Sequence, residues 1–165
     1  REVFELVPEI QSSGAVFTCV DLDAEALNFA RDRFSHASLL LDNVEFLTYN
    51  ALRMFDYEMA EKEFGLRDIV YSVGYFDYLP DDFLTKLLNT LYRLLTPGGK
   101  LIMAYKDAAR YRSQVYHWFC DWDGFKQRYE HDFDRICKQA EIPRDALSIE
   151  RVESGSILFY TATKK

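Results

Sequence analysis

The pattern of hydrophobic and polar positions switches between two periods along most of the chain. Short apolar or alternating runs predict four strands, at residues 16–21, 44–49, 67–74 and 100–105. Apolar side chains at helical spacing predict helices at residues 1–12, 24–35, 55–64 and 80–95. Strands that alternate with helices are joined by right-handed crossovers and lie parallel, so the pattern predicts an α/β fold.

The C-terminal part follows a different pattern. Residues 107–122 are rich in aromatic side chains, residues 125–139 predict a helix, and residues 148–152 and 157–163 predict two strands. The turn between these strands is short enough for a hairpin, so we expect the last strand to enter the sheet antiparallel. The 165 residues, 48% of them hydrophobic, suffice for one substantial core, and we expect a single domain over residues 1–165.

Asp21 is the first candidate site residue, because it ends the first predicted strand. In a parallel sheet, ligands collect beyond the carboxyl ends of the strands, and an acid there can accept hydrogen bonds from both hydroxyls of a ribose. The alternative is that Asp21 simply begins the next helix, since Asp is a favoured N-cap. Asp23 already fits that purpose ahead of Ala24, which leaves Asp21 available for a ligand.

Composition narrows the function classes. The formal net charge is -7, from 20 basic and 27 acidic residues without a basic stripe, which argues against a nucleic-acid partner. Cys19, Cys120 and Cys137 form no CxxC pair, so we expect neither a metal site nor a disulfide framework, and a reducing cytoplasm fits best. No apolar run approaches the roughly 20 residues that a membrane span needs. We therefore expect a soluble, cytoplasmic protein.

Four segments together resemble the class I S-adenosylmethionine-dependent methyltransferases. They are VDLDAEAL at residues 20–27, the strand that ends at Asn50, DIVYS at residues 68–72 and LLTPGGKL at residues 94–101. The last is the most specific, because dinucleotide dehydrogenases share the acidic strand end but not usually that turn. The resemblance covers almost the whole chain and implies a Rossmann-like methyltransferase sheet with S-adenosylmethionine as the cofactor.

The resemblance also implies a set of cofactor-binding residues at the strand ends. Asp21 would hold the ribose hydroxyls, Leu22 would pack on the adenine, and Asn50 would contact the adenine amino group. The last position is more often Asp in the family, but the amide oxygen of Asn also accepts a hydrogen bond. The remaining expected cofactor-binding residues are Ala51, Ser72 and Val73.

One feature of the family is absent from this chain: the first strand and its Gly-x-Gly-x-Gly loop, which precede the helix that matches residues 1–12. In the family that strand lies between those matching residues 16–21 and 68–73, and the loop brings backbone amides close to the methionine part of the cofactor. We therefore expect an N-terminally truncated sheet with a central gap. Either the sheet closes over the gap, another chain fills it, or this is one piece of a larger polypeptide; exposed edges would also favour self-association.

Two further segments resemble bacterial methyltransferases related to the enzyme that makes 3-hydroxypalmitic acid methyl ester. They are GYFDYLPD at residues 74–81 and CDWDGFKQRY at residues 120–129. This resemblance implies a small-molecule acceptor, methylated at the carboxylate of a fatty or organic acid. Phe76, Asp77 and Tyr78 follow the strand that borders the methyl site in the family, so we expect them to line the acceptor pocket. The alternative is that both aromatic residues pack in the core and the acid is solvated.

Methyl transfer needs few catalytic groups, because it is an in-line displacement for which the protein mainly orients the acceptor and excludes water. A carboxylate acceptor needs no general base, whereas a hydroxyl would. The candidate catalytic residues are Asp77 and His117, and a half-buried packing role is the alternative for His117. The candidate substrate-binding residues, besides Phe76 and Tyr78, are Lys106, Trp122 and Arg128, of which the two basic ones could pair with an acidic acceptor.

Three functions of different classes remain open. The leading hypothesis is an enzyme, or the larger part of one, that methylates a small molecule. The second is a non-catalytic module of the same fold, retained for interaction. The third is an NAD-dependent oxidoreductase, which the Pro-Gly-Gly turn and the antiparallel hairpin disfavour.

Overall fold

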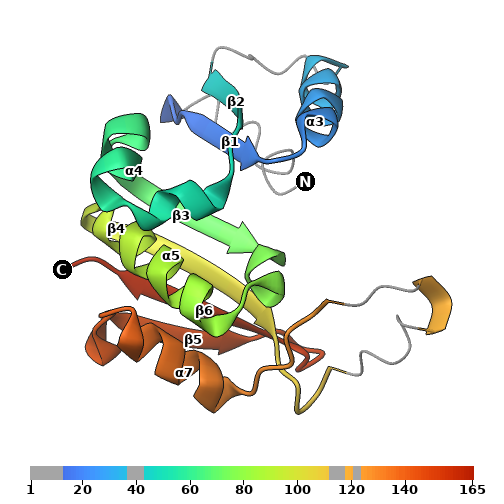
Figure 1. Cartoon of the computed structure of the whole chain (residues 1–165), viewed down its shortest axis with the longest axis vertical. Helices are drawn as coiled ribbons and strands as arrows, with labels where there is room; N and C mark the ends of the chain where they lie inside the picture. The colour runs from blue at the N-terminus through green and yellow to red at the C-terminus, as the bar shows by residue number, and fades with distance from the viewer. Residues whose placement is uncertain (1–12, 37–42, 112–117, 121–123) are drawn as a thin grey trace. The chain divides into compact units, whose positions relative to one another are not determined.

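The computed structural model describes residues 13–36, 43–111, 118–120 and 124–165. The chain forms two compact units, Arg1–Ala51 and Leu52–Lys165 (Figure 1). The predicted helix at residues 1–12 lies outside the described residues. The expectation of a single domain over residues 1–165 stays a prediction.

The first unit is a parallel pair of strands with one helix. Its elements are β1 (Phe17–Asp21), α3 (Ala24–His36) and β2 (Val44–Thr48). β1 and β2 run parallel with Asp21 opposite Thr48, so both carboxyl ends lie at the same edge. The buried ring of Phe34 forms a small core with Phe17, Val44 and Phe46. The sequence prediction of a strand, a helix and a parallel strand is confirmed here.

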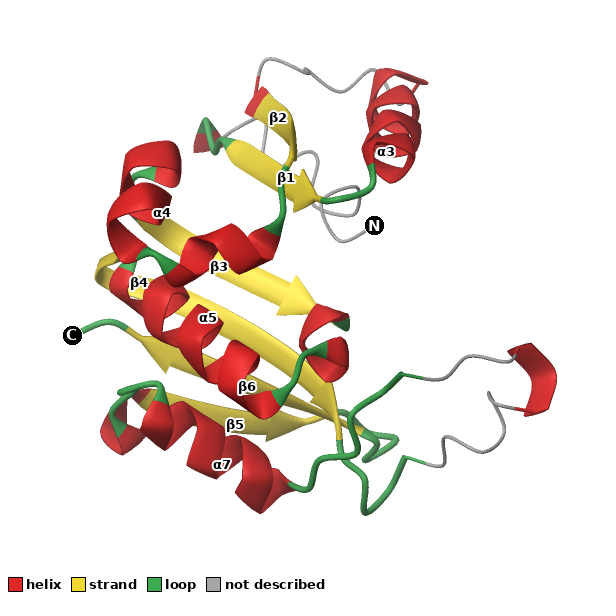
Figure 2. Cartoon of the chain, in the orientation of Figure 1, coloured by secondary structure: helices red, strands yellow, loops and turns green. Residues whose placement is uncertain are grey.

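The second unit is a four-stranded mixed sheet in the order β3-β4-β6-β5 (Figure 2). Its elements are η2 (Ala51–Phe55, whose first residue belongs to the first unit), α4 (Tyr57–Phe64), β3 (Arg67–Val73), η3 (Tyr75–Tyr78), α5 (Asp81–Arg93), β4 (Leu95–Lys106), α7 (Glu130–Gln139), η4 (Arg144–Ala146), β5 (Leu147–Arg151) and β6 (Ile157–Thr163). β3 and β4 pair parallel, whereas β6 runs antiparallel to both of its neighbours. The predicted antiparallel C-terminal hairpin is therefore confirmed.

One face of this sheet carries the core of the unit. Leu101, Met103 and Tyr105 of β4 are buried on that face, and Tyr160 of β6 lies beside them. α5 and α7 both lie on this side of the sheet (Figure 1), and Tyr105 stacks on Phe133 of α7 with ring centroids 4.2 Å apart. The leucine-rich helical pattern of residues 83–95 thus packs against the sheet.

β4 begins earlier than the sequence pattern predicted. The predicted strand started at residue 100, but the observed strand starts at Leu95 and includes the Pro-Gly-Gly turn. The backbone N–H of Arg67 donates to the carbonyl of Leu94 at 2.8 Å, which brings the start of β3 against this turn. A Cβ at Gly99 would lie 2.9 Å from the carbonyl oxygen of Thr96 and 3.0 Å from that of Asp68, so only glycine allows this approach.

The expectation that β3 is a buried strand is wrong for one of its faces. Ile69 is 61% exposed, Tyr71 43% and Val73 52%. These side chains point away from the face on which Leu101 is buried, because side chains alternate along a strand. β3 is the terminal strand of its sheet, and no described residue pairs with its outer edge as a strand.

α7 begins five residues later than predicted, at Glu130 rather than residue 125. The preceding residues make contacts that a helix would break. The backbone N–H of Lys126 donates to the carbonyl of Asp77 at 2.7 Å, and Arg128 forms a β-bridge with Asp107. A capping box between Tyr129 and Asp132 then starts the helix.

Candidate active site

Asp21 lies exposed at the carboxyl end of β1, as the sequence predicted for a ligand-binding acid. Its Oδ1 accepts a hydrogen bond from the backbone N–H of Asp23 at 3.0 Å. Asp23 in turn caps α3 by accepting from the N–H groups of Glu25 at 2.8 Å and Ala26 at 3.3 Å. No described residue donates a hydrogen bond to the second carboxylate oxygen of Asp21. The capping function therefore belongs to Asp23.

The other predicted cofactor residues of the first unit lie near the same strand ends. Leu22 directly follows Asp21 and is 67% exposed. Asn50 follows β2 and is exposed, and Ala51 is the first residue of η2. The backbone N–H of Tyr49 donates to the carbonyl of Asp21 at 2.8 Å, which fixes the two strand ends beside each other. An exposed acid, an exposed apolar side chain and an amide thus occur at one edge.

In the second unit, the end of β3 leads directly into the predicted acceptor residues. Ser72 is half-buried and Val73 is exposed at the end of the strand. Gly74 has φ 93°, a left-handed conformation that suits glycine, and it turns the chain into η3. The side chain of Phe76 is buried, which fits the alternative that it packs in the core.

Asp77 is buried, with 3% exposure, rather than solvated. Its Oδ2 lies 2.7 Å from the Nζ of Lys106, and its Oδ1 accepts from the backbone N–H of Lys106 at 3.2 Å. Its carbonyl oxygen accepts from the N–H of Lys126 at 2.7 Å. One residue therefore joins η3, the end of β4 and the segment before α7.

The ammonium group of Lys106 is held by aromatic rings as well as by Asp77. It lies 4.1 Å from the ring centroid of Phe125 and 5.6 Å from that of Tyr111. The ring of Tyr78 packs on that of Phe125, with centroids 4.8 Å apart. Such cation–π contacts stabilise an ammonium, more strongly where water is partly excluded. The Lys106 side chain keeps 24% exposure, so part of it remains accessible.

Arg128 is buried with 3% exposure, and the hydrogen bonds of its guanidinium stay within the protein. Nη1 donates to the carbonyl of Phe76 at 3.0 Å, Nη2 donates to the carbonyl of Leu79, and Nε donates to Asp81 at 2.9 Å. A guanidinium with this set of bonds anchors the loop between β3 and α5. These contacts give Arg128 a structural role, and its predicted role in substrate binding stays a prediction.

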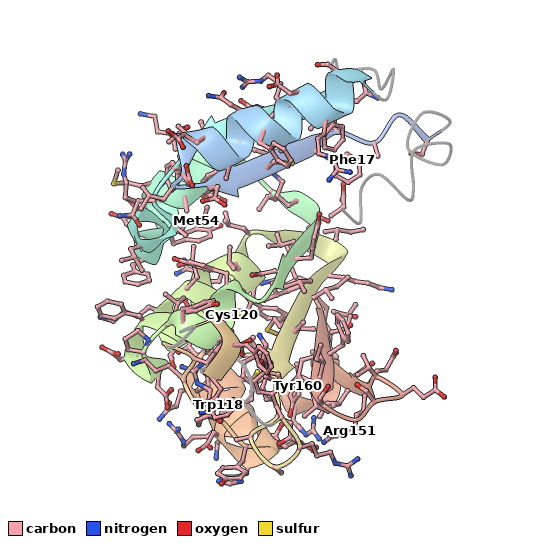
Figure 3. All side chains as sticks on the ribbon, turned by 90° about the vertical axis from the view of Figure 1, so that its right-hand side faces the viewer. Phe17, Met54, Trp118, Cys120, Arg151 and Tyr160 are labelled. Atoms are coloured by element: carbon pink, nitrogen blue, oxygen red, sulfur yellow. The ribbon has the colours of Figure 1, made fainter. Side chains whose placement is uncertain are left out.

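A second buried acid, Asp107, follows β4 and pairs with Arg151 at the end of β5. The Nη1 of Arg151 lies 2.7 Å from Asp107 and also donates to the carbonyl of Gly155 at 2.7 Å. Its Nη2 donates to Glu130 at 2.9 Å. Arg151 and Tyr160 are labelled in Figure 3, in the two strands of the C-terminal hairpin. The network ties that hairpin to the end of β4 and the start of α7.

The cations lower the pKa of two of these acids. Burial disfavours the charged form of Asp107, but hydrogen bonds from Arg151 and from the backbone of Ala109 outweigh it and hold the pKa of that carboxyl below its ordinary value. For Asp81, burial is likewise outweighed by hydrogen bonds from Arg135 and Arg128, so its pKa is also lowered. Both acids are therefore ionised at neutral pH.

Two predicted site residues, His117 and Trp122, lie outside the described residues. The sequence analysis did not single out Tyr111 and Phe125, whose rings lie near the Lys106 ammonium, or Asp107, which follows Lys106 in the chain. Their spacing carries no motif, because the three segments meet only in the folded unit. The position of Phe125 directly after Gly124 is a local signal that could have drawn attention to it.

In the ranges that the structure describes, no group of three or more His, Cys, Asp or Glu side chains could hold a metal ion. Burial raises the pKa of the Cys137 thiol to about 12, so it stays protonated. None of the described helices is both long and apolar enough to cross a bilayer.

Comparison with solved structures gives the fold. A possible exported protein from Bordetella parapertussis has a TM-score of 0.71 at 18% identity, over 92% of this chain and 54% of the other. Magnesium protoporphyrin IX methyltransferase from Synechocystis PCC 6803, solved with bound SAH, has a TM-score of 0.66 at 14% identity, over 96% of this chain and 68% of the other. An O-methyltransferase family protein from Burkholderia thailandensis has a TM-score of 0.64 at 14% identity, over 92% of this chain and 43% of the other. The chain thus spans about half the length of the first and third of these proteins.

No curated protein sequence matches the chain. A family profile does match it, that of the methyltransferase domain, over residues 5–99. The match includes β1, β2 and β3, and with them three of the four segments that carry the resemblance, and it ends at residue 99, within the fourth segment at residues 94–101. More than half of the chain is matched, and the chain belongs to the methyltransferase domain family.

Proposed function

We propose that this chain forms the larger part of an S-adenosylmethionine-dependent methyltransferase site that acts on the carboxylate of a small organic or fatty acid. Its membership of the methyltransferase domain family supports the cofactor and the reaction class. When bound, the cofactor supplies a methyl group on a positively charged sulfonium. The protein then has to hold the cofactor, orient the acceptor and exclude water.

The residues at the end of β1 fit the adenosine part of that cofactor. Asp21 is exposed, and among the described residues the one hydrogen bond of its carboxylate is the local bond to Oδ1, so the carboxylate can accept from ribose hydroxyls. Leu22 offers an exposed apolar surface for the adenine, and Asn50 at the end of β2 offers an amide. Ala51, Ser72 and Val73 complete the proposed cofactor-binding set.

The acceptor assignment rests on the ion pairs of three acids in the second unit. Asp77, Asp81 and Asp107 each pair with a cation: Lys106 at 2.7 Å, Arg128 at 2.9 Å and Arg151 at 2.7 Å, respectively. A carboxylate that already neutralises a cation is a poor general base, because protonation would leave that cation uncompensated. A carboxylate acceptor is ionised near neutral pH and needs no base, so it suits this arrangement.

Calorimetric titration tests the cofactor. We expect the chain to bind S-adenosylhomocysteine and not NAD. Binding of NAD alone would favour an oxidoreductase, and binding of neither would favour a non-catalytic module of the same fold.

A matched pair of acceptors tests the carboxylate. We expect methylation of 3-hydroxypalmitate, and no methylation of its methyl ester, in which the hydroxyl is present and the carboxylate is blocked. Methylation of the ester at its hydroxyl would contradict the carboxylate assignment and would indicate a base such as His117.

A further inference from the structure

We propose that Lys106 binds the acceptor carboxylate and that Asp77 is its positioning residue, rather than a group that accepts a proton. The inference rests on the proposed function for the nature of the acceptor. It assigns different roles to two residues whose side chains lie 2.7 Å apart.

The first argument is the position of Lys106 among the basic residues of this region. The guanidinium groups of Arg128 and Arg151 each donate hydrogen bonds to carboxylates and carbonyls of the protein. The ammonium of Lys106 has three N–H donors, of which one is directed to Asp77, and its side chain keeps 24% exposure. Lys106 is therefore both fixed in place and still able to donate to a ligand.

The second argument is the environment of that ammonium. The rings of Phe125 and Tyr111 lie 4.1 and 5.6 Å from Nζ. An apolar chain attached to a carboxylate could pack on such rings while its charged end meets Lys106. This arrangement fits an acid with an apolar body.

The third argument concerns Asp77 itself. Its two carboxylate oxygens both accept hydrogen bonds from Lys106, one from the backbone N–H and one from the ammonium. It is 3% exposed, so no open face remains for a reacting hydroxyl. These contacts hold the lysine in one orientation, which is the function of a positioning residue.

The ion pair between Lys106 and Asp77 predicts opposite effects on anion binding for two substitutions of Asp77. Asp77→Asn keeps an oxygen that can accept from Lys106 but removes the negative charge that opposes an incoming carboxylate, so anion binding should tighten. Asp77→Ala removes both the charge and the contact that holds Lys106, so anion binding should weaken. A role in overall folding alone would not produce opposite signs.

The experiment is an NMR titration of the chain with octanoate, which has a carboxylate and an apolar tail. We expect Lys106→Met to weaken octanoate binding at least tenfold and Asp77→Ala to weaken it severalfold, whereas Asp77→Asn tightens it severalfold. Lys126→Met is the matched control, because Lys126 is an exposed lysine two residues from Arg128, and its affinity should stay within twofold of the unchanged chain. Circular dichroism and thermal melting of each variant establish that the fold is retained.

The proposal is overturned if the unchanged chain does not bind octanoate, if Lys106→Met binds it as well as Lys126→Met does, or if both Asp77 variants change affinity in the same direction. None of these results depends on the cofactor. Binding of S-adenosylhomocysteine, measured on the same samples, decides the proposed function separately.

Discussion

The strand ends of the two units carry acidic residues in opposite states. Asp21 in the first unit is exposed, and its one described hydrogen bond to a carboxylate oxygen is local. Asp77 and Asp107 in the second unit are buried and paired with cations. Asp21 ends β1, Asp107 directly follows β4, and Asp77 lies in η3 just after β3, so their positions in the sequence do not reveal which of them is exposed. Asp21 keeps an exposed carboxylate, whereas the contacts of Asp77 and Asp107 hold segments of the protein together.

The strength of that contrast can be measured through stability and affinity. An acid that holds segments together should affect the free energy of unfolding when its partner is removed. Substitution of an acid that binds a ligand should instead lower ligand affinity and leave the free energy of unfolding nearly unchanged.

The largest effect is expected for Arg128→Met. The substitution removes the side-chain donor to the buried carbonyl of Leu79, one of two donors to the carbonyl of Phe76, and a partner of Asp81. We expect the free energy of unfolding to fall by about 2 to 4 kcal/mol in total. Urea denaturation measures it. Arg135→Met is the control, because that side chain is 46% exposed and its ion pairs should contribute less than about 1 kcal/mol; equal losses in the two variants would contradict the role of Arg128.

A smaller effect is expected for Asp107→Asn. The substitution removes the charge that pairs with Arg151, which is partly exposed, so we expect a loss of about 1 to 3 kcal/mol at neutral pH. The lowered pKa of Asp107 means that its contribution is present above the pKa of an unfolded Asp, about 3.9, and is lost as pH falls through the folded value. Unfolding free energies measured between neutral and acidic pH should therefore converge for the two proteins. A constant difference down to strongly acidic pH would show that the ion pair is not the cause.

For Asp21→Ala we expect an effect on affinity instead of stability. Loss of the acceptor for the ribose hydroxyls should weaken S-adenosylhomocysteine binding by about 1 to 3 kcal/mol. The free energy of unfolding should change by less than about 1 kcal/mol, because the side chain is exposed. Calorimetric titration and urea denaturation of one preparation give both values. Unchanged affinity would remove Asp21 from the proposed site.

The smallest effect on stability is expected for Ile69→Lys in β3. Ile69 is 61% exposed at the terminal strand of the sheet, so unfolding should change by less than about 0.5 kcal/mol. A lysine there should nevertheless reduce self-association through this edge, because charged side chains discourage pairing of exposed strands. Light scattering measures the association. Glu150→Lys in β5 is the control, since that edge strand already places Ser148 and Glu150 on its exposed positions.

Much of the fold follows from the sequence, because the periods of its hydrophobic positions are set by local geometry. The helical spacing of residues 83–95 and the apolar run before Asp21 each predict an element without reference to the rest of the chain. The short turn between β5 and β6 also determines that these strands pair antiparallel. The function of Asp23 as a cap follows from its position directly before a helix.

The tertiary structure alone decided the state of each charged side chain. Asp77, Lys106 and Phe125 come from three segments, and no spacing in the sequence indicates that they meet. α7 starts later than the sequence predicts for the same reason, because contacts with η3 and with Asp107, which follows β4, compete with the helical pattern of residues 125–129. Burial and the distance to a cation depend on the whole unit, so a sequence can present an acid at a strand end, but only the packed structure determines whether it is open to a ligand or neutralised by a neighbour.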